Sequence, residues 1–205
     1  MTRGQWRRTL RQRRRSLSKA QQARASRDLC RRIAQLPSFQ RSRRIGLYLP
    51  NDGEIDPTPL LYLAQRRGKH CYLPVVSGWP RQQMRLQRLR PGQRWARNRF
   101  GINEPASAPH WQVKAWQLDL LLLPLVGFDR QGNRLGMGGG FYDRCLAYRQ
   151  RRRHWRRPQL LGLAHQCQEV PQLPIADWDI PLDGIVTDRY SLFLQESGLG
   201  TDTRR

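Results

Sequence analysis

The sequence has no apolar run long enough to cross a membrane, and it has few cysteines. No stretch approaches the roughly 18 apolar residues of a membrane helix, and the basic N-terminus lacks the apolar segment of a secretory signal. The four cysteines lie far apart, without a C-x-x-C pair, which excludes a dense disulfide scaffold. His70 beside Cys71 and His165 near Cys167 are isolated half-sites for zinc, and structural roles explain them better. We therefore expect a cytoplasmic protein with reduced thiols and no membrane attachment.

Acidic residues and lysine are also scarce. The chain has 15 acidic and 38 basic residues, of which only Lys19, Lys69 and Lys114 are lysine, so the net charge of +23 comes almost entirely from arginine. Such a surplus attracts nucleotides, acidic metabolites and nucleic acids without selecting among them. A non-catalytic nucleic-acid-binding protein is therefore one interpretation. The sequence contains no RRM, KH or zinc-finger signature that would favour specific binding to nucleic acid.

Apolar segments that alternate with helical patterns predict an open α/β fold. Short strands at 44–50 and 70–76 flank a helix that Asp56 and Pro57 begin and Gly68 ends, a βαβ pattern typical of parallel strands. The pattern also predicts helices at 6–17, 18–36 and 141–148, an antiparallel strand at 84–89, loops or turns at 90–99 and 101–105, a buried strand at 118–126, and short strands at 160–164 and 185–187.

The predicted architecture is a three-layer αβα open sheet, mostly parallel with antiparallel additions. The length of 205 residues suits one domain, which we expect over residues 1–195 with basic N-terminal helices. A polar tail is expected at 196–205.

The strongest functional signal is the glycine stretch from Arg134 to Arg144, RLGMGGGFYDR, which follows the buried strand. Its glycines lack a Cβ and permit positive φ, so successive main-chain amides can converge on a phosphate. The helix expected from Phe141 and the guanidinium groups of Arg134 and Arg144 favour negative charge at the same place. Asp143 would repel such a ligand unless a cation such as Mg²⁺ lies between them. The alternative is a glycine-rich turn with a solvated Arg–Asp pair. The stretch is neither a Walker loop nor a dinucleotide fingerprint.

Two other segments carry candidate ligand contacts. Glu54 follows the first predicted strand, at the edge where open α/β sheets bind ligands, although loop glutamates are often inert. Arg7, Arg8 and Arg11 either reach a bound polyphosphate or form a solvated face that attracts RNA. The segment 173–183 is expected to be irregular and contains three acidic residues.

Together these features resemble the 5-formyltetrahydrofolate cyclo-ligase family, also called 5,10-methenyltetrahydrofolate synthetases. The resemblance spans nearly the whole chain and rests on these segments: Leu10 to Arg11 with Arg13 to Ser18, Gly53 to Asp56, Gly68 to Pro74, Gly101 to Pro105, Arg134 to Arg144, and Trp178 to Leu182. The glycine stretch is highly specific in this setting. The family's sheet is of the sugar-isomerase and CoA-transferase type, which agrees with the predicted order of elements.

The resemblance implies ATP- and Mg²⁺-dependent conversion of 5-formyltetrahydrofolate to 5,10-methenyltetrahydrofolate, with release of ADP and phosphate. Arg134 and Tyr142 are the expected catalytic residues, and Gly53 and Glu54 are expected to contact the folate. Asp143 and Asp179 are expected to hold Mg²⁺. The implied ATP contacts are Arg7, Arg8, Thr9, Leu10, Arg11, Arg134, Leu135, Gly136, Met137, Gly138, Gly139, Gly140, Phe141 and Tyr142. The family often has lysine where this chain has Arg7, so at this ATP contact one positively charged side chain replaces another.

The implied chemistry begins with phosphorylation of the formyl oxygen, after which N10 of the folate closes the ring and phosphate leaves. Phosphoryl transfer needs positioning and charge neutralisation more than acid–base groups, which explains why no His-Asp or Cys-His set stands out. Phe141 and Tyr142 either flank a ligand ring or pack in the core. A phosphosugar-processing relative on the same type of sheet is a further alternative, but it would not need two acids for Mg²⁺.

Overall fold

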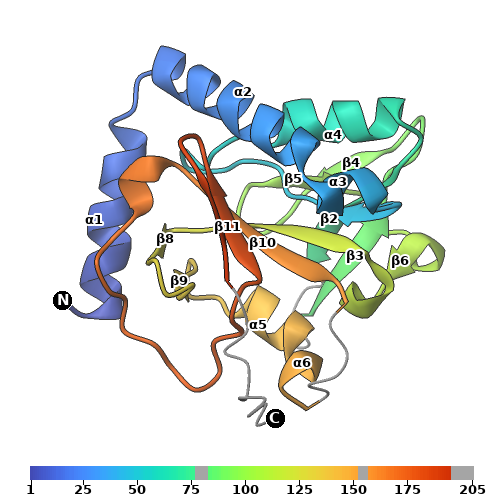
Figure 1. Ribbon diagram of the computed structural model, residues 1–205. Helices are drawn as coiled ribbons and strands as arrows, with labels where there is room; N and C mark the ends of the chain where they lie inside the picture. Colours follow the sequence, from blue (N-terminus) through green and yellow to red (C-terminus); the bar gives the residue numbers. More distant parts are fainter. Residues whose placement is uncertain (77–82, 152–156, 195–205) are drawn as a thin grey trace, which may run out of the picture.

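The computed structural model describes residues 1–76, 83–151 and 157–194, and in these residues eight strands form one mixed sheet flanked by helices (Figure 1). The strand order is β12-β11-β10-β7-β1-β2-β3-β6, and the pairs β4–β5 and β8–β9 lie outside this sheet. The strands are β1 (Arg44–Gly46), β2 (His70–Val76), β3 (Met84–Arg88), β4 (Trp95–Arg97), β5 (Asn103–Pro105), β6 (Gln112–Val113), β7 (Leu120–Pro124), β8 (Gly127–Phe128), β9 (Arg134–Leu135), β10 (Gln159–Ala164), β11 (Gly184–Thr187) and β12 (Ser191–Phe193). The α-helices are α1 (Arg3–Arg15), α2 (Lys19–Gln35), α3 (Pro37–Arg41), α4 (Thr58–Arg66), α5 (Phe141–Leu146) and α6 (Tyr148–Arg151).

The centre of the sheet is parallel and its edges are antiparallel. Neighbouring strands from β11 through β10, β7 and β1 to β2 run parallel, while β12 and β3 are added antiparallel at the two sides. Helix α4 connects β1 to β2, which confirms the predicted βαβ unit and the α/β fold class. The start of α4 differs slightly from the prediction, because Pro57 occupies the N-cap position and Asp56 accepts a hydrogen bond from the amide of Thr58 at 2.8 Å.

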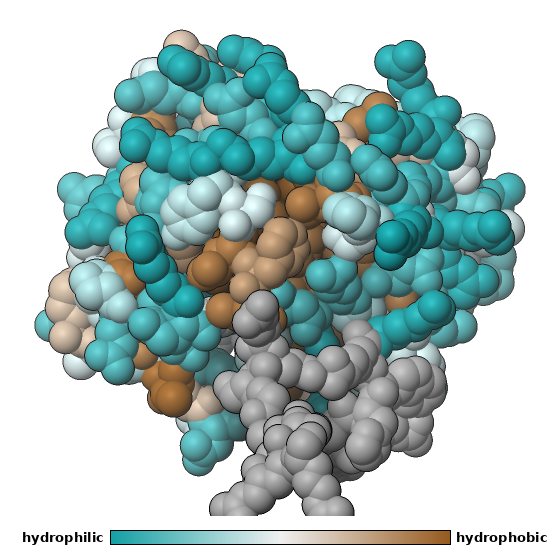
Figure 2. All heavy atoms as spheres, viewed as in Figure 1, coloured by the Kyte–Doolittle hydropathy of each residue, from teal (hydrophilic) through white to brown (hydrophobic). Residues whose placement is uncertain are grey.

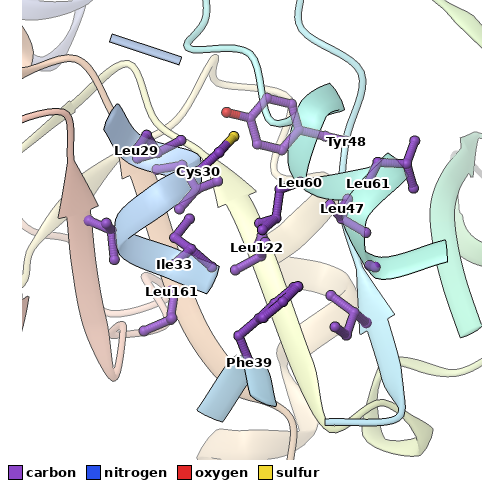
Figure 3. Close-up of a cluster of buried hydrophobic side chains, with 14 of the residues drawn as sticks. Leu29, Cys30, Ile33, Phe39, Leu47, Tyr48, Leu60, Leu61, Leu122 and Leu161 are labelled. Carbon is purple, nitrogen blue, oxygen red and sulfur yellow. The ribbon is translucent and has the colours of Figure 1, made fainter. Parts of the chain in front are cut away.

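Helices α2, α3 and α4 cover one face of the sheet (Figure 1). Helix α2 begins at a capping box, as its sequence predicts. Leu29 and Ile33 of α2 and Phe39 of α3 are fully buried among strand residues that include Leu122 and Leu161 (Figure 3). Each such burial contributes about 1.5–3 kcal/mol, so this layer is a major source of stability.

The opposite face is covered by α5 and by the irregular segment 173–183. Leu146 of α5 packs with Ile180 and Leu182 against strand residues such as Leu121 and Leu160. The segment 173–183 contains no helix or strand, as predicted, and it is held in place by these apolar contacts. The apolar side of this segment fixes its polar residues at the end of the sheet.

Helix α1 covers neither face but lies across the end of the sheet, beside β8 and β9 (Figure 1). It begins at Arg3 instead of the predicted Trp6, because Thr2 and Gln5 form a capping box that the prediction missed. Leu10 of α1 is buried in a small separate cluster with Val126, Leu135, Val170 and Leu173. These partners follow the carboxyl ends of the parallel strands, so α1 is attached where the strands finish.

The prediction for residues 90–105 was wrong, because this region contains the antiparallel hairpin β4–β5 instead of loops alone. Alternation along β3 would leave Gln87 exposed beside Arg85, but the structure differs. Its side chain is buried, donates to the carbonyl of Ala106 at 2.8 Å and accepts from the amide of Ala108 at 2.7 Å. The chain leaving the hairpin folds over β3 and supplies these partners, which strand alternation cannot indicate.

Hydrophilic residues dominate the face of the molecule seen in Figure 2, and apolar residues gather in its middle. Among the described residues, no helix combines the length and apolar character of a membrane span. In the arginine-rich stretch 149–157, Arg149 forms a two-point ion pair with Asp183 at 2.9 and 3.1 Å. Residues 152–156 and the predicted tail at 196–205 lie outside the described residues.

Candidate active site

A cavity of about 510 Å³ opens at the carboxyl ends of β1, β2 and β7. It is lined by the start of α1, the loop after β1, the β4–β5 hairpin, part of the segment 173–183, and the glycine loop, which we define as residues 136–140. This volume is in the range of about 300–1,000 Å³ that is usual for small-molecule sites. Open α/β sheets bind ligands at this edge, so the position agrees with the fold.

The glycine loop forms one wall of the cavity. Gly138 and Gly140 have φ values of +99° and +63°, which favour glycine. A Cβ on Gly140 would lie 2.8 Å from a guanidinium nitrogen of Arg144, and a Cβ on Gly138 would lie 3.4 Å from the guanidinium carbon of Arg7. Within residues 1–76, 83–151 and 157–194, no group accepts a hydrogen bond from the amides of the glycine loop. Among the described residues, these amides have no acceptor, so the loop can offer main-chain donors to an anion.

Helix α1 contributes a row of basic side chains to the site. The arginine row, spaced three or four residues apart and therefore on one helix face, consists of Arg3, Arg7, Arg11 and Arg14. Arg3 donates to both carboxylate oxygens of Asp179, at 2.5 and 3.0 Å. Arg7 Nε donates to the carbonyl of Gly136 at 2.9 Å. The first half of the row thus connects α1 to the segment 173–183 and to the glycine loop.

The second half of the row holds the loop after β1. Arg14 is fully buried and donates to the carbonyl and carboxylate of Asp52 at 2.8 and 3.0 Å and to the carbonyl of Leu125 at 3.3 Å. Arg11 donates to the same carboxylate of Asp52 at 2.7 Å. Burial acts to raise the pKa of Asp52, but the arginine hydrogen bonds outweigh it and lower the pKa. A fixed, ionised Asp52 therefore anchors the loop that carries Glu54.

Glu54 lies in the wall of the cavity and is almost fully buried. Burial raises its pKa to about 7, against the opposing effects of Arg14 and of a backbone hydrogen bond from Asn51. Its Oε2 accepts from the amide of Asn51 at 3.2 Å. Near neutral pH the carboxyl group is therefore protonated in part of the molecules, and it can donate or accept a hydrogen bond.

Arg134 and Asp143 form an ion pair beside the glycine loop. Arg134 is almost fully buried, and its Nε donates to the carbonyl of Ile180 at 3.0 Å while an Nη donates to Asp143. Asp143 is thus paired with an almost fully buried arginine. Burial raises the pKa of Tyr142 far above its ordinary value, so its phenol group is neutral.

The two acids expected to hold Mg²⁺, Asp143 and Asp179, both line the cavity. Carboxylate oxygens suit Mg²⁺, which usually takes one or two of them together with phosphate oxygens and water. In the described part of the chain, no group of three His, Cys, Asp or Glu residues could hold a metal. The donor set therefore suits a Mg²⁺ that arrives with a phosphate ligand better than a metal bound by side chains alone.

Some of the predicted site residues line the cavity, and the others do not. The predicted ligand contacts that line the cavity are Arg7, Glu54, Arg134, Gly136, Met137, Gly138, Gly139, Gly140, Phe141 and Tyr142. Leu10 and Leu135 point into the core, and Arg11 is bound to Asp52. Arg8, Thr9 and Gly53 are likewise absent from the lining, although Gly53, with a φ of +74°, shapes the loop that carries Glu54.

Several lining residues were missed by the sequence analysis. Arg3 was missed because the helix was predicted to begin later. The β4–β5 hairpin supplies Asn98, Phe100 and Glu104, with Glu104 accepting from Asn98 Nδ2 at 3.1 Å. Phe100 packs edge-to-face against Phe141, with their ring centroids 5.9 Å apart. The segment Gly101 to Pro105, on which the family resemblance partly rests, is the signal that could have indicated this wall.

The fold and the cavity together are those of an α/β enzyme with a site suited to a phosphate-bearing ligand and a second, less polar ligand. The chain belongs to the 5-formyltetrahydrofolate cyclo-ligase family, whose model matches residues 1–188. It is 39% identical over 178 residues to the 5-formyltetrahydrofolate cyclo-ligase of Escherichia coli K12, covering 87% of this chain and 96% of that protein. It is 37% identical over 186 residues to the cyclo-ligase of Haemophilus influenzae, covering 90% and 96%.

The solved structures agree with this assignment. The 5,10-methenyltetrahydrofolate synthetase of Aquifex aeolicus superposes with a TM-score of 0.82 at 31% identity, covering 99% of this chain and 97% of that one. The corresponding protein of Mycoplasma pneumoniae has the same fold, with a TM-score of 0.71 at 23% identity, covering 92% and 99%. The resemblance predicted from the sequence is therefore confirmed, and the nucleic-acid-binding alternative is not supported.

Proposed function

We propose that this protein converts 5-formyltetrahydrofolate to 5,10-methenyltetrahydrofolate with ATP and Mg²⁺. The observation that carries the proposal is that one cavity combines two kinds of lining. The glycine loop and Arg7, here called the phosphate wall, provide donors and positive charge, and Glu54 together with apolar residues such as Leu49 and Pro74, here called the folate wall, lines the same cavity. A phosphate donor and a folate can therefore meet in one place.

The phosphate wall is suited to hold the triphosphate of ATP. The main-chain amides of the glycine loop, which have no acceptor among the described residues, bind phosphate oxygens, and Arg7 adds a positive charge beside them. Asp143 and Asp179 are the residues that would hold Mg²⁺. When bound, Mg²⁺ would neutralise phosphate charge and hold the transferred group in line with its acceptor. Arg134 fixes Asp143 and thereby the start of α5.

The folate wall is suited to hold a flat ring system. Apolar contacts are available from Leu49, Pro74, Met84 and Ile102, and the Glu54 carboxyl group can bind the polar edge of a pterin. Tyr142 follows the glycine loop in sequence and lines the same cavity, and the charge of Glu54 adds to the effect of burial that keeps its phenol neutral. Glu54 thus orients the substrate, and Tyr142 contributes at the junction of the two ligands.

The chemistry required of the protein is mainly positioning. Transfer of the γ-phosphoryl group to the formyl oxygen makes a good leaving group. Attack by N10 on the formyl carbon then closes the ring, with loss of phosphate and of the N10 proton. The chain holds the two reactants together, excludes water and offsets the charge that spreads over the phosphoryl group. These tasks match amides, arginines and carboxylates better than a nucleophilic side chain.

The test is to incubate the purified protein with 5-formyltetrahydrofolate, ATP and Mg²⁺ and to follow methenyl-folate absorbance. We expect the absorbance to rise only when all three are present. We also expect phosphate release to depend on the folate, because the formyl oxygen is the proposed acceptor of the phosphoryl group. Absence of the methenyl product, or equal phosphate release with and without folate, would contradict the proposal.

The arginine surplus remains a separate matter. A net charge of +23 supports non-specific attraction of polyanions, which we propose as a property of the surface and not as a second function. A filter-binding assay with random RNA, repeated at rising salt, would show binding that disappears at high ionic strength if this is so.

A further inference from the structure

Arg3 lines the cavity although it lies outside the segments that the family resemblance assigns to ligand binding. It is the first residue of α1 and holds both carboxylate oxygens of Asp179, at 2.5 and 3.0 Å. Its Nη1 also donates to the carbonyl of Pro174 at 3.0 Å. Hydrogen bonding to Asp179 raises the pKa of Arg3, so its guanidinium keeps its full charge.

The two carboxylates suited to Mg²⁺ are held in different ways. Arg134, the partner of Asp143, is only 5% exposed and is also fixed by a main-chain carbonyl. Arg3 is 24% exposed on the first turn of its helix, so its side chain has room to exchange partners. If Arg3 leaves Asp179, the carboxylate keeps the hydrogen bond that its Oδ2 accepts from the amide of Ala176 at 2.9 Å. Asp179 therefore stays oriented without Arg3.

Arg3 and Arg7 form a doubly positive edge next to the glycine loop. They are one helical turn apart and both line the cavity. Burial, and then repulsion from Arg3, lower the pKa of Arg7. A polyanion bound between these guanidinium groups and the amides of the glycine loop would relieve that repulsion.

We propose that Arg3 is a positioning and phosphate-binding residue that exchanges partners during binding, a role that rests on the proposed function of this cavity. In the ligand-free protein Arg3 holds Asp179. When triphosphate and Mg²⁺ enter, Asp179 is released to the metal and the Arg3 guanidinium moves to a phosphate oxygen. Arg3 therefore opposes binding of metal alone and promotes binding of the nucleotide.

This exchange is tested by binding measurements that do not require turnover. Mn²⁺, whose electron paramagnetic resonance signal changes on binding, is titrated into the protein without nucleotide, and ATP with Mg²⁺ is titrated separately by calorimetry. For Arg3→Gln we expect Mn²⁺ to bind about fivefold more tightly and ATP with Mg²⁺ about tenfold more weakly than in the wild type. Arg3→Lys keeps the charge but loses the two-point contact, so both shifts should be smaller.

Arg13→Gln is the matched control. Arg13 is exposed on the same helix and does not line the cavity, so its replacement removes the same formal charge and should leave both affinities unchanged. A general effect of net charge would appear equally in both variants and would overturn the proposal.

Partner exchange predicts that Arg3→Gln changes the Mn²⁺ and ATP affinities in opposite directions, whereas a structural role does not. If Arg3 merely supports the segment 173–183, Arg3→Gln will weaken both ligands, and the proposal falls. It also falls if Mn²⁺ affinity is unchanged in Arg3→Gln. Asp179→Asn distinguishes these results from failure of the proposed function. If it weakens Mn²⁺ binding while Arg3→Gln does not strengthen it, Asp179 remains a metal ligand and only the role of Arg3 is rejected. The methenyl-folate assay reports on the proposed function independently.

Discussion

The carboxylate of Glu54 lies 3.8 Å from the guanidinium of Arg14, and their side chains are only 10% and 0% exposed. This separation is too long for a hydrogen bond, so Arg14 offsets only part of the effect of burial. The pKa of Glu54 consequently rises to about 7. The acid on the proposed folate wall is thus poised to change its charge near neutral pH.

The stability of the protein should depend on pH through Glu54. Its folded-state pKa of about 7 is above the ordinary 4.5, so its contribution to stability is fully present below pH 4.5 and is lost as the pH rises through 7. The amide of Glu54→Gln does not ionise, so the variant does not lose stability in this way as the pH rises. Between pH 4.5 and 8, the free energy of unfolding of the variant should gain roughly 2–3 kcal/mol relative to the wild type, measured by urea denaturation. Parallel pH curves for the two proteins would contradict the raised pKa.

Glu54→Gln should also separate folate binding from ATP binding. The amide nearly preserves the shape of the carboxyl group but cannot change its charge, so kcat/KM for 5-formyltetrahydrofolate should fall by about 10- to 100-fold. ATP affinity, measured by calorimetry, should be unchanged because the substitution leaves the glycine loop and Arg7 intact. Unaltered turnover would reject Glu54 as the orienting residue.

Asp143→Asn should raise the Mg²⁺ requirement. The change removes the charge of a proposed metal ligand and leaves Arg134 without its ion pair, so most activity should be lost and the remainder should need more Mg²⁺. Activity is titrated against Mg²⁺ for both proteins. Asp28→Asn, which affects only surface pairs with Arg24 and Arg31, is the control and should change stability by about 0–1 kcal/mol with no effect on Mg²⁺. Superimposable curves of activity against Mg²⁺ for Asp143→Asn and wild type would reject Asp143 as a metal ligand.

Gly140→Ala should weaken ATP binding beyond its effect on stability. Gly140 has a φ of +63°, and an added Cβ would meet the Arg144 guanidinium at 2.8 Å. Gly68 has a similar φ of +69° with open space around its Cβ position and lies outside the cavity. Both alanine variants should lose about 1–2 kcal/mol of stability, measured by denaturation. Only Gly140→Ala should also lose ATP affinity, by about tenfold. Equal ATP affinities in the two variants would contradict a phosphate-binding role for the loop.

The parts of the fold that sequence predicted are those set by local patterns. The βαβ unit follows from short apolar runs around a capped helix, and the helix after the glycine stretch follows from the abrupt end of the glycines. Glu54 was found for a similar reason, because its position after a strand is a local property. Parallel sheets then bring such strand ends together at one edge, which makes the cavity predictable before its walls are known.

What sequence did not predict depends on partners far along the chain. Arg14 is typical of a solvated helix face, yet it is buried because Asp52 and Leu125 surround it with acceptors. Gln87 is buried for the same kind of reason. The β4–β5 hairpin has little local strand signal and forms against the rest of the cavity wall. Nothing in a single sequence window records these long-range contacts.

The pairing of Arg3 with Asp179 joins residues that are 176 positions apart. During synthesis, α1 is made well before the segment that carries Asp179, the acid that its first residue must meet. The helix can attach to the loop after β1 early, whereas its first turn must wait for the segment that carries Asp179. A nascent or truncated chain that ends before this segment therefore exposes the basic edge of α1 without its acidic partner. Completion of the binding site consequently waits for synthesis of the segment 173–183.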